Sequence, residues 1–243
     1  MFINSENCRN CKSEVSQNYC AQCGQPVYLK RIDSHYILHE IEHVLHFERG
    51  ILYTIRELIT NPGRNLKNYL LENRSRLVKP IIFIVVTSLV YSICSKLFHF
   101  EDAYLSYRDD KMSATHSIFN WIQGHYGYAN IIMGICIALW TKLFFRRYPF
   151  NVFEILIVLC FVMGMGMLIF SVFGVIGGLT ELHLMPAAGI AGFVYTTWAI
   201  GQFYEKSKAI SYVKALFAYI LGMLSFTILA LIIGTITDII IKH

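Results

Sequence analysis

Charged residues are scarce in this sequence. They make up 15% of the 243 residues, whereas about a quarter of an average soluble domain is charged. The deficit is greatest after Lys79, where long stretches carry no charge, while 55% of all residues are hydrophobic. Because a soluble domain does not have this composition, the sequence predicts an integral membrane protein with a small polar N-terminal part.

The N-terminus also lacks a basic segment followed by an apolar one, so we expect no cleaved signal peptide. The net charge is only +5, and no signature of a nucleic-acid-binding fold accompanies it. The basic residues stand next to apolar runs, which favours anionic lipid over nucleic acid as their counter-charge.

Seven cysteines divide into two groups. Three of them fall inside apolar runs, where a free thiol behaves as a small hydrophobic group. The other four, in the order C-x2-C-x8-C-x2-C, are Cys8, Cys11, Cys20 and Cys23.

The spacing of these four cysteines predicts a structural zinc site in a zinc ribbon over residues 1–30. Each C-x2-C pair presents two thiolates, Gly24 permits a tight turn after the second pair, and four thiolates leave no open metal position. So short a segment buries no core, so the metal would supply most of its folding free energy. A pair of disulfides and a rubredoxin-like iron site are the alternatives. Reduced thiolates would place this end in the cytoplasm.

Residues 34–79 are amphipathic and basic. Apolar residues at helical spacing, the N-cap Ser34 and the turn at Asn61-Pro62-Gly63 predict helices over about 34–48, 51–60 and 62–76. Such helices lie in the lipid headgroup layer with the apolar side down and the cations on the phosphates. The predicted lipid-binding residues are Arg64, Lys67, Arg74, Arg76 and Lys79.

Residues 39–43 read HEIEH, which matches the HExxH motif of zinc hydrolases. In such an enzyme His39 and His43 would bind zinc, and Glu40 would activate a water molecule. The extended form of the motif needs a glycine and a third histidine where this chain has His46 and Arg49. We therefore interpret the histidines as a solvated helix face, with a second metal or hydrolase site as the alternative.

Five apolar stretches are long enough for a hydrocarbon layer of ~30 Å. Basic residues between them predict a cytoplasmic N-terminus, and an odd number of spans then leaves the C-terminus outside. Gly174 and Gly178 form a GxxxG pair, which favours close helix packing over a flexible transport gate. The predicted spans cover about residues 81–100, 129–145, 155–178, 187–204 and 212–241.

The segments CRNCK, CAQCGQ, HEIEHVLHFERG, TIRELITNPG and YLLENRSRLVKP follow one another in order. In this order the chain resembles a family of uncharacterised bacterial membrane proteins, common in Bacteroidetes, with a zinc ribbon before the pattern H…G…T…L…PG…YL…R…P. The resemblance covers residues 8–90 and implies a layout rather than a chemistry. Asn73 replaces a glycine usual in that family. The matching positions are His39, His43, Gly50, Thr54, Leu58, Pro62, Gly63, Tyr69, Arg74 and Pro80.

The layout of five spans and the segment WAIGQFYEKSKAISYVKAL are also similar to the Yip family of trafficking and membrane-shaping proteins. That likeness concerns layout, and a fold does not fix a function.

The expected fold is an all-α membrane protein with a zinc ribbon (1–30), amphipathic cytoplasmic helices (34–79) and five transmembrane helices (80–243). We expect it in the bacterial inner membrane with a periplasmic C-terminus. The expected function is that of a non-enzymatic adaptor or membrane organiser. The zinc ribbon would dock a cytoplasmic protein, and the basic amphipathic helices over residues 34–79 would bind anionic lipid. A homo-oligomer would be compatible with this role. The alternatives are a transporter or channel for a small solute or lipid, and a membrane-associated zinc hydrolase. A filled core would favour the adaptor, and a continuous polar cavity would favour transport.

Overall fold

The computed structural model separates the chain into two compact units, Met1–Val44 and Leu45–His243, which we call the N-terminal unit and the helical unit. In the N-terminal unit, the described residues form turns and one isolated antiparallel bridge between Asn7 and Glu14. The structure describes residues 7–8, 11–15, 18–24, 50–98, 117–118, 121–122 and 126–242.

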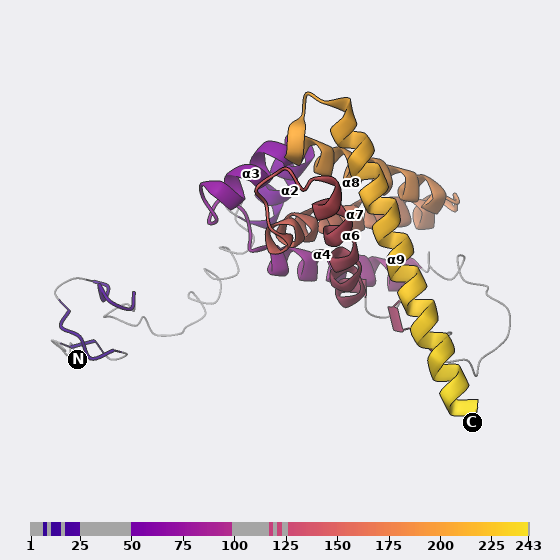
Figure 1. Ribbon diagram of the computed structural model, residues 1–243, viewed down its shortest axis with the longest axis horizontal. Helices are drawn as coiled ribbons and strands as arrows, with labels where there is room; N and C mark the ends of the chain where they lie inside the picture. Colours follow the sequence, from indigo (N-terminus) through magenta and orange to yellow (C-terminus); the bar gives the residue numbers. More distant parts are fainter. Residues whose placement is uncertain are drawn as a thin grey trace. The chain divides into compact units, whose positions relative to one another are not determined.

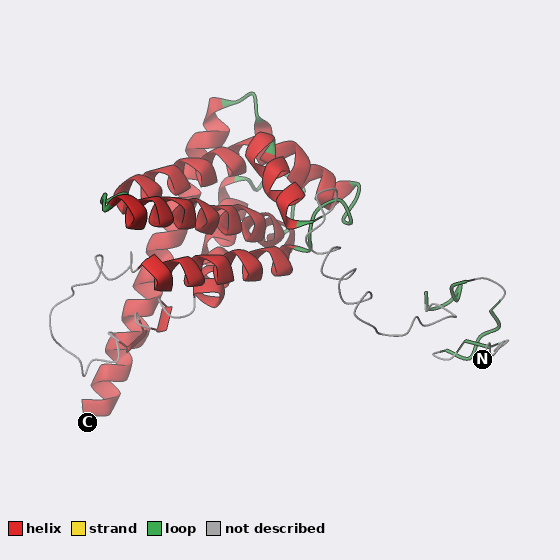
Figure 2. Ribbon diagram, turned by 180° about the vertical axis from the view of Figure 1, so that it is seen from behind, coloured by secondary structure: helices red, strands yellow, loops and turns green. Residues whose placement is uncertain are grey.

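The described part of the helical unit consists of α-helices joined by loops (Figures 1 and 2). Five of them occupy the apolar stretches in which the sequence predicts spans, and two form the amphipathic segment before them. The helices are α2 (Ile51–Thr60), α3 (Pro62–Leu71), α4 (Pro80–Phe98), α6 (Tyr126–Phe144), α7 (Val152–Thr180), α8 (Met185–Glu205) and α9 (Ala209–Lys242).

Among the described residues, three helices are long and apolar enough to cross a membrane: α4, α7 and residues 209–240 of α9. The apolar stretch of α6 is shorter, Tyr128–Phe144. In α8, polar residues such as Thr196 and Gln202 dilute the apolar character, and both are buried against the protein. Length and composition therefore identify three candidate spans, compared with the five that the sequence predicts.

α7 is the central helix, in contact with α2, α4, α6 and α8. It is apolar around its whole circumference, as expected of a helix surrounded by others. Asn151 and Glu154 fix its start as a capping box, in which each side chain accepts a hydrogen bond from the other residue's backbone N–H. At Gly164, a Cβ atom would lie 2.8 Å from the ring of Phe83 on α4, so the missing side chain allows the two helices to approach closely.

The hairpin of α2 and α3 packs onto α7 and α8. Leu58 and Leu66 are buried, and the ring of Tyr69 stands edge-on to Phe161 of α7, with 5.2 Å between the centroids. At Gly63, a Cβ atom would overlap the backbone carbonyl group of Gln202 on α8. The glycine of the Asn61-Pro62-Gly63 turn is therefore needed for close approach between two backbones.

Two predictions for this segment are corrected. The third amphipathic helix ends at Leu71 rather than near Arg76, because the Asn73 side chain accepts hydrogen bonds from the backbone N–H and hydroxyl of Ser75 and forms a local turn. The apolar stripe of the hairpin also packs against other helices: Ile51, Leu58, Leu66 and Leu70 are buried, while Leu52, Ile59 and Leu71 are exposed.

Replacing Gly63 with alanine should destabilise the helical unit, because the new methyl group must displace the backbone of α8. Overpacking of this kind costs about 1–3 kcal/mol. The midpoint of thermal unfolding of the full chain in detergent should fall. Gly189→Ala is the matched control, since nothing lies within 4 Å of its Cβ position. Equal midpoints for the two variants would show that the backbone contact is unimportant.

Candidate functional site

The four cysteines of the N-terminal unit lie together. All four sulfur atoms are within 4.8 Å of one another, with 3.5 Å between Cys8 and Cys23 and 3.5 Å between Cys11 and Cys20. In a tetrahedral site with Zn–S bonds of ~2.3 Å, neighbouring sulfurs are ~3.8 Å apart. All four are free thiols, so the set fits a single metal ion held by four thiolates.

Two equivalent turns bring the cysteines together. The N–H of Lys12 donates to the carbonyl of Cys8, and the N–H of Gly24 donates to the carbonyl of Cys20, both at 2.9 Å. Each turn ends in a left-handed residue, with φ of 62° at Lys12 and 70° at Gly24. The turn predicted at Gly24 is present, and Lys12 adopts the same conformation without the freedom of glycine.

Ser13 belongs to this site, although the cysteine spacing does not reveal it. Its hydroxyl lies 2.9 Å from the sulfur of Cys11 and 3.1 Å from that of Cys20. Hydrogen bonding from Ser13 is the largest cause that lowers the pKa of both thiols, that of Cys20 to about 6. A lowered pKa favours the thiolate, which is the form of cysteine that binds a metal.

The site is suited to structure rather than to catalysis. Cys8 and Cys20 are buried while Cys11 and Cys23 are exposed. With all four positions of a tetrahedral ion taken by thiolates, no position remains for water or substrate. The predicted second metal site at His39, Glu40 and His43 lies outside the described residues, as does the predicted helix over 34–48.

Purified protein should contain about one zinc ion per chain, as a four-thiolate site requires. The double substitution Cys20→Ser, Cys23→Ser should remove it, which elemental analysis can measure. His39→Ala with His43→Ala is the control and should leave the metal content unchanged. Full metal content in the cysteine variant would mean that other residues hold the ion.

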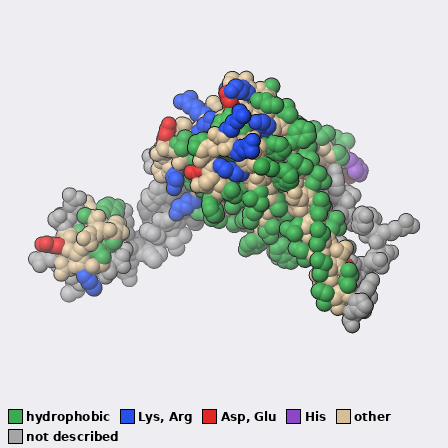
Figure 3. All heavy atoms as spheres, viewed as in Figure 1, with side chains coloured by type: hydrophobic (Ala, Val, Ile, Leu, Met, Phe, Trp, Pro, Cys, Tyr) green, Lys and Arg blue, Asp and Glu red, His purple; other side chains and the backbone are tan. Residues whose placement is uncertain are grey.

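Lysine and arginine side chains gather on one side of the helical unit (Figure 3). Contacts link the elements that carry them: Lys67 on α3 donates to the carbonyl of Tyr204 at the end of α8, and Tyr148 between α6 and α7 donates to Glu205. We call this region the basic end. Its exposed cations are Arg56, Arg64, Arg74, Arg76, Lys79, Arg146, Arg147, Lys206 and Lys208.

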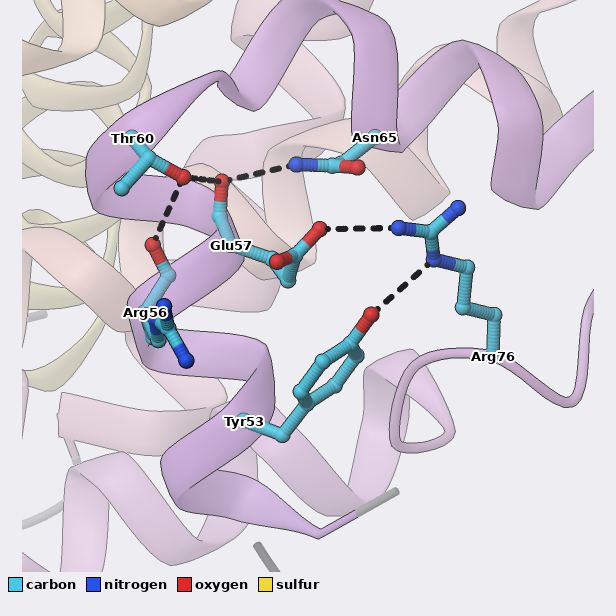
Figure 4. A network of polar contacts seen from close by, with 6 residues as sticks. All are labelled: Tyr53, Arg56, Glu57, Thr60, Asn65 and Arg76. Carbon is cyan, nitrogen blue, oxygen red and sulfur yellow. Dashed lines mark hydrogen bonds and ion pairs between the residues drawn. The ribbon is translucent and has the colours of Figure 1, made fainter. Parts of the chain in front are cut away.

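Two of the predicted lipid-binding residues have partners within the protein. The amine of Lys67 lies 3.1 Å from the Tyr204 carbonyl, where it satisfies an unpaired group at a helix C-terminus. Arg76 forms an ion pair of 3.1 Å with Glu57 and donates to the hydroxyl of Tyr53 (Figure 4). Both cations thus position the hairpin and its connection to α4.

The other predicted lipid-binding residues are exposed: Arg64, Arg74 and Lys79. Within the described part of the chain, the side chains of Arg64 and Lys79 form no hydrogen bond or ion pair. Arg146, Arg147 and Lys206 of the neighbouring turns are exposed as well, whereas Lys208 pairs with Glu205 at 2.9 Å.

An aromatic cluster lies at the basic end. The rings of Phe145 and Tyr204 stack with 3.7 Å between centroids and 6° between planes, and Phe150 packs against both Phe203 and Tyr204. The ammonium group of Lys214 lies 5.8 Å from the centroid of the Phe145 ring, within reach of a cation–π interaction. The cluster ties the α6–α7 turn to α8 and α9, and so fixes where their cations stand.

Residues of the predicted family pattern build the joint between α2 and α4. The hydroxyl of Thr54 donates to the carbonyl of Gly50 and accepts a hydrogen bond from the N–H of Val78, both at 3.1 Å. Pro62 occupies the first turn of α3, and Pro80 begins α4. These positions serve architecture and present no reactive group.

One family model matches the chain, over residues 48–92, and its description is "Protein of unknown function (DUF3667)". In this segment the chain is similar to that family. The match covers α2, α3, their connection to α4 and most of α4, which is less than half of the chain. Comparison with curated proteins found no match, and comparison with solved structures found none either.

Proposed function

We propose that the protein is a non-enzymatic membrane adaptor. Its N-terminal unit, folded around a structural zinc ion as a zinc ribbon, docks a cytoplasmic protein, and its basic end grips anionic lipid. The observation that carries this proposal is the packed apolar core of the helical unit, in which no charged side chain is buried among the described residues.

One continuous cluster of buried side chains joins α2, α3, α4, α6, α7, α8 and the start of α9. Phe83, Phe161 and Val162 are fully buried within it. The buried hydroxyls of Thr87 and Ser171 donate to carbonyls of their own helices, and no buried charged side chain occurs among the described residues.

A path for a polar solute needs charged or unpaired polar groups along it. In the described part of the chain, the buried polar atoms without a hydrogen-bond partner belong to Thr141 of α6 and to Thr197, Gln202 and Tyr204 of α8. They lie in the halves of those two helices that end at the basic end, so the absence of buried charge favours the adaptor over a transporter.

The proposed topology has five spans, with α6 and α8 crossing beside α4, α7 and α9. The basic end then faces the cytoplasm of a bacterial cell, in accordance with the positive-inside rule. The N-terminus is cytoplasmic, where thiolates stay reduced, and the C-terminus is periplasmic. Anionic lipid of the inner leaflet meets the exposed cations of the basic end.

Replacing Arg64, Arg74 and Lys79 with glutamine should weaken the preference of the full-length protein for anionic lipid, because each cation contributes ~1 kcal/mol near a charged surface. Spin-labelled phosphatidylglycerol and phosphatidylcholine in reconstituted vesicles measure that preference. Lys67→Gln with Arg76→Gln is the control, and its effect should be smaller because both side chains are held within the protein, by the Tyr204 carbonyl and by the Glu57 carboxylate. An unchanged preference in the triple variant would contradict the lipid role of these residues.

The docking role of the N-terminal unit can be tested with a photo-crosslinking amino acid at Tyr19, which is 65% exposed between the two cysteine pairs. In cells, it should form an adduct with one recurring cytoplasmic protein, and Cys20→Ser with Cys23→Ser should abolish that adduct. A crosslinker at Leu71, exposed on α3, provides the control position and should not give that adduct. The same adduct from both positions, or from the cysteine variant, would overturn the docking role.

A further inference from the structure

A pocket of about 480 Å³ lies where α4 ends and α7 turns back into α8. This is the end of the helical unit away from the basic end, because α4 and α7 both begin at the basic end and run to the pocket. Phe98 of α4, Phe173 of α7 and Met185 of α8 contribute to its walls. Its volume falls within the roughly 300–1,000 Å³ that is usual for small-molecule sites.

Glycines of α7 make room for the pocket. Gly174, Gly177 and Gly178 all line it. The glycine face of α7, which the sequence predicts to serve helix packing, therefore also lines a pocket. Packing is still part of its role, since a Cβ atom at Gly178 would lie 2.6 Å from the ring of Phe98. At Gly177, a Cβ atom would lie 2.9 Å from the carbonyl oxygen of Leu182 and 3.8 Å from the Cβ of Leu184, so the glycine face and the α7–α8 turn form the floor together.

The turn between α7 and α8 closes one side of the pocket. Glu181 ends α7 in the left-handed conformation, with φ of 57°, which a residue with a side chain rarely adopts. The N–H of Leu184 then donates to the carbonyl of Leu182 at 2.9 Å, and that carbonyl faces Gly177. The backbone of the turn is therefore held tightly against the glycine face.

The pocket has an apolar floor and one carboxylate at its mouth, and the exposed Lys96 of α4 stands outside the lining. Its ionisable lining residues are Glu181 and His183, both exposed, and its lining contains no lysine or arginine. Beside it, Ile176, Leu179 and Leu97 expose apolar side chains on the outer faces of α7 and α4. In a membrane these faces meet lipid, so a chain can reach the floor from the hydrocarbon layer while its polar head stays at the turn.

We propose that this pocket binds one acyl chain of a lipid whose headgroup carries an amine. The apolar floor takes the chain, the carboxylate of Glu181 attracts the ammonium group, and the same carboxylate disfavours an anionic headgroup. This inference rests on the membrane-spanning assignment of α4 and α7 and not on the adaptor role. The protein would then bind different lipids at its two ends, anionic lipid at the basic end and amine-bearing lipid at the pocket.

The test uses the full chain in nanodiscs that contain phosphatidylethanolamine or phosphatidylglycerol with the same photoactivatable acyl chain. Mass spectrometry locates the adducts. Phosphatidylethanolamine should label the pocket walls around Phe98 and Met185 several times more than phosphatidylglycerol does. Equal labelling by the two lipids would overturn the proposed headgroup selectivity, and absence of label at the pocket would overturn the site.

Gly174→Leu should fill the floor and abolish the pocket adducts, while Gly166→Leu should keep them. Gly166 lies on the same helix with nothing within 4 Å of its Cβ position, so it controls for the change of glycine to leucine. Persistent pocket adducts in Gly174→Leu would overturn the proposal.

Glu181→Gln, at an exposed turn, tests the headgroup separately. In this variant the two lipids should label the pocket equally, and an unchanged difference in labelling would refute the role of the carboxylate. Selectivity at the basic end should stay as it is in all three variants.

Discussion

The helical unit depends on the burial of the first half of α7, over residues 155–167. This helix is apolar on every side, and the other elements cover it: α4 at Gly164, α6 and α8 along its length, and the hairpin through the contact between Tyr69 and Phe161. In hydrocarbon, helices gain little from the hydrophobic effect when they associate, so close packing supplies the attraction. This explains why glycines occur where backbones or rings approach most closely.

The hairpin of α2 and α3 uses its apolar face for this packing, which changes how the protein meets lipid. A free amphipathic helix inserts apolar side chains into the headgroup layer, but here Leu58 and Leu66 contact other helices. Lys67 and Arg76 are also engaged, with the carbonyl of Tyr204 and the carboxylate of Glu57. The cations left for the proposed contact with lipid are distributed over several elements, and the aromatic cluster around Tyr204 fixes the elements that carry Arg146, Arg147 and Lys206.

Local signals in the sequence predict the elements of this structure well. C-x2-C pairs turn locally, so their spacing predicts the cysteine cluster, and Asn61-Pro62 predicts the start of α3. The sequence does not reveal features that depend on distant residues. Ser13 becomes a site residue only because the chain folds it between Cys11 and Cys20. The dual use of the α7 glycines follows from where α4 ends. The early end of α3 is instead a local effect of the turn between Asn73 and Ser75. Residues 39–43, which read HEIEH, lie outside the described part of the chain.

The two ends of the helical unit differ in charge because of their side chains and not because of helix dipoles. Successive helices from α4 to α9 alternate in direction, so their macrodipoles largely cancel. The difference arises because most of the exposed arginines and lysines stand at the basic end, while the pocket lining contains Glu181 and His183 and the last turn of α4 carries the exposed Lys96. These charges belong to individual exposed side chains. If the two ends bind lipid as proposed, a few exposed substitutions can therefore change the lipid preference of either end without disturbing the packing around α7.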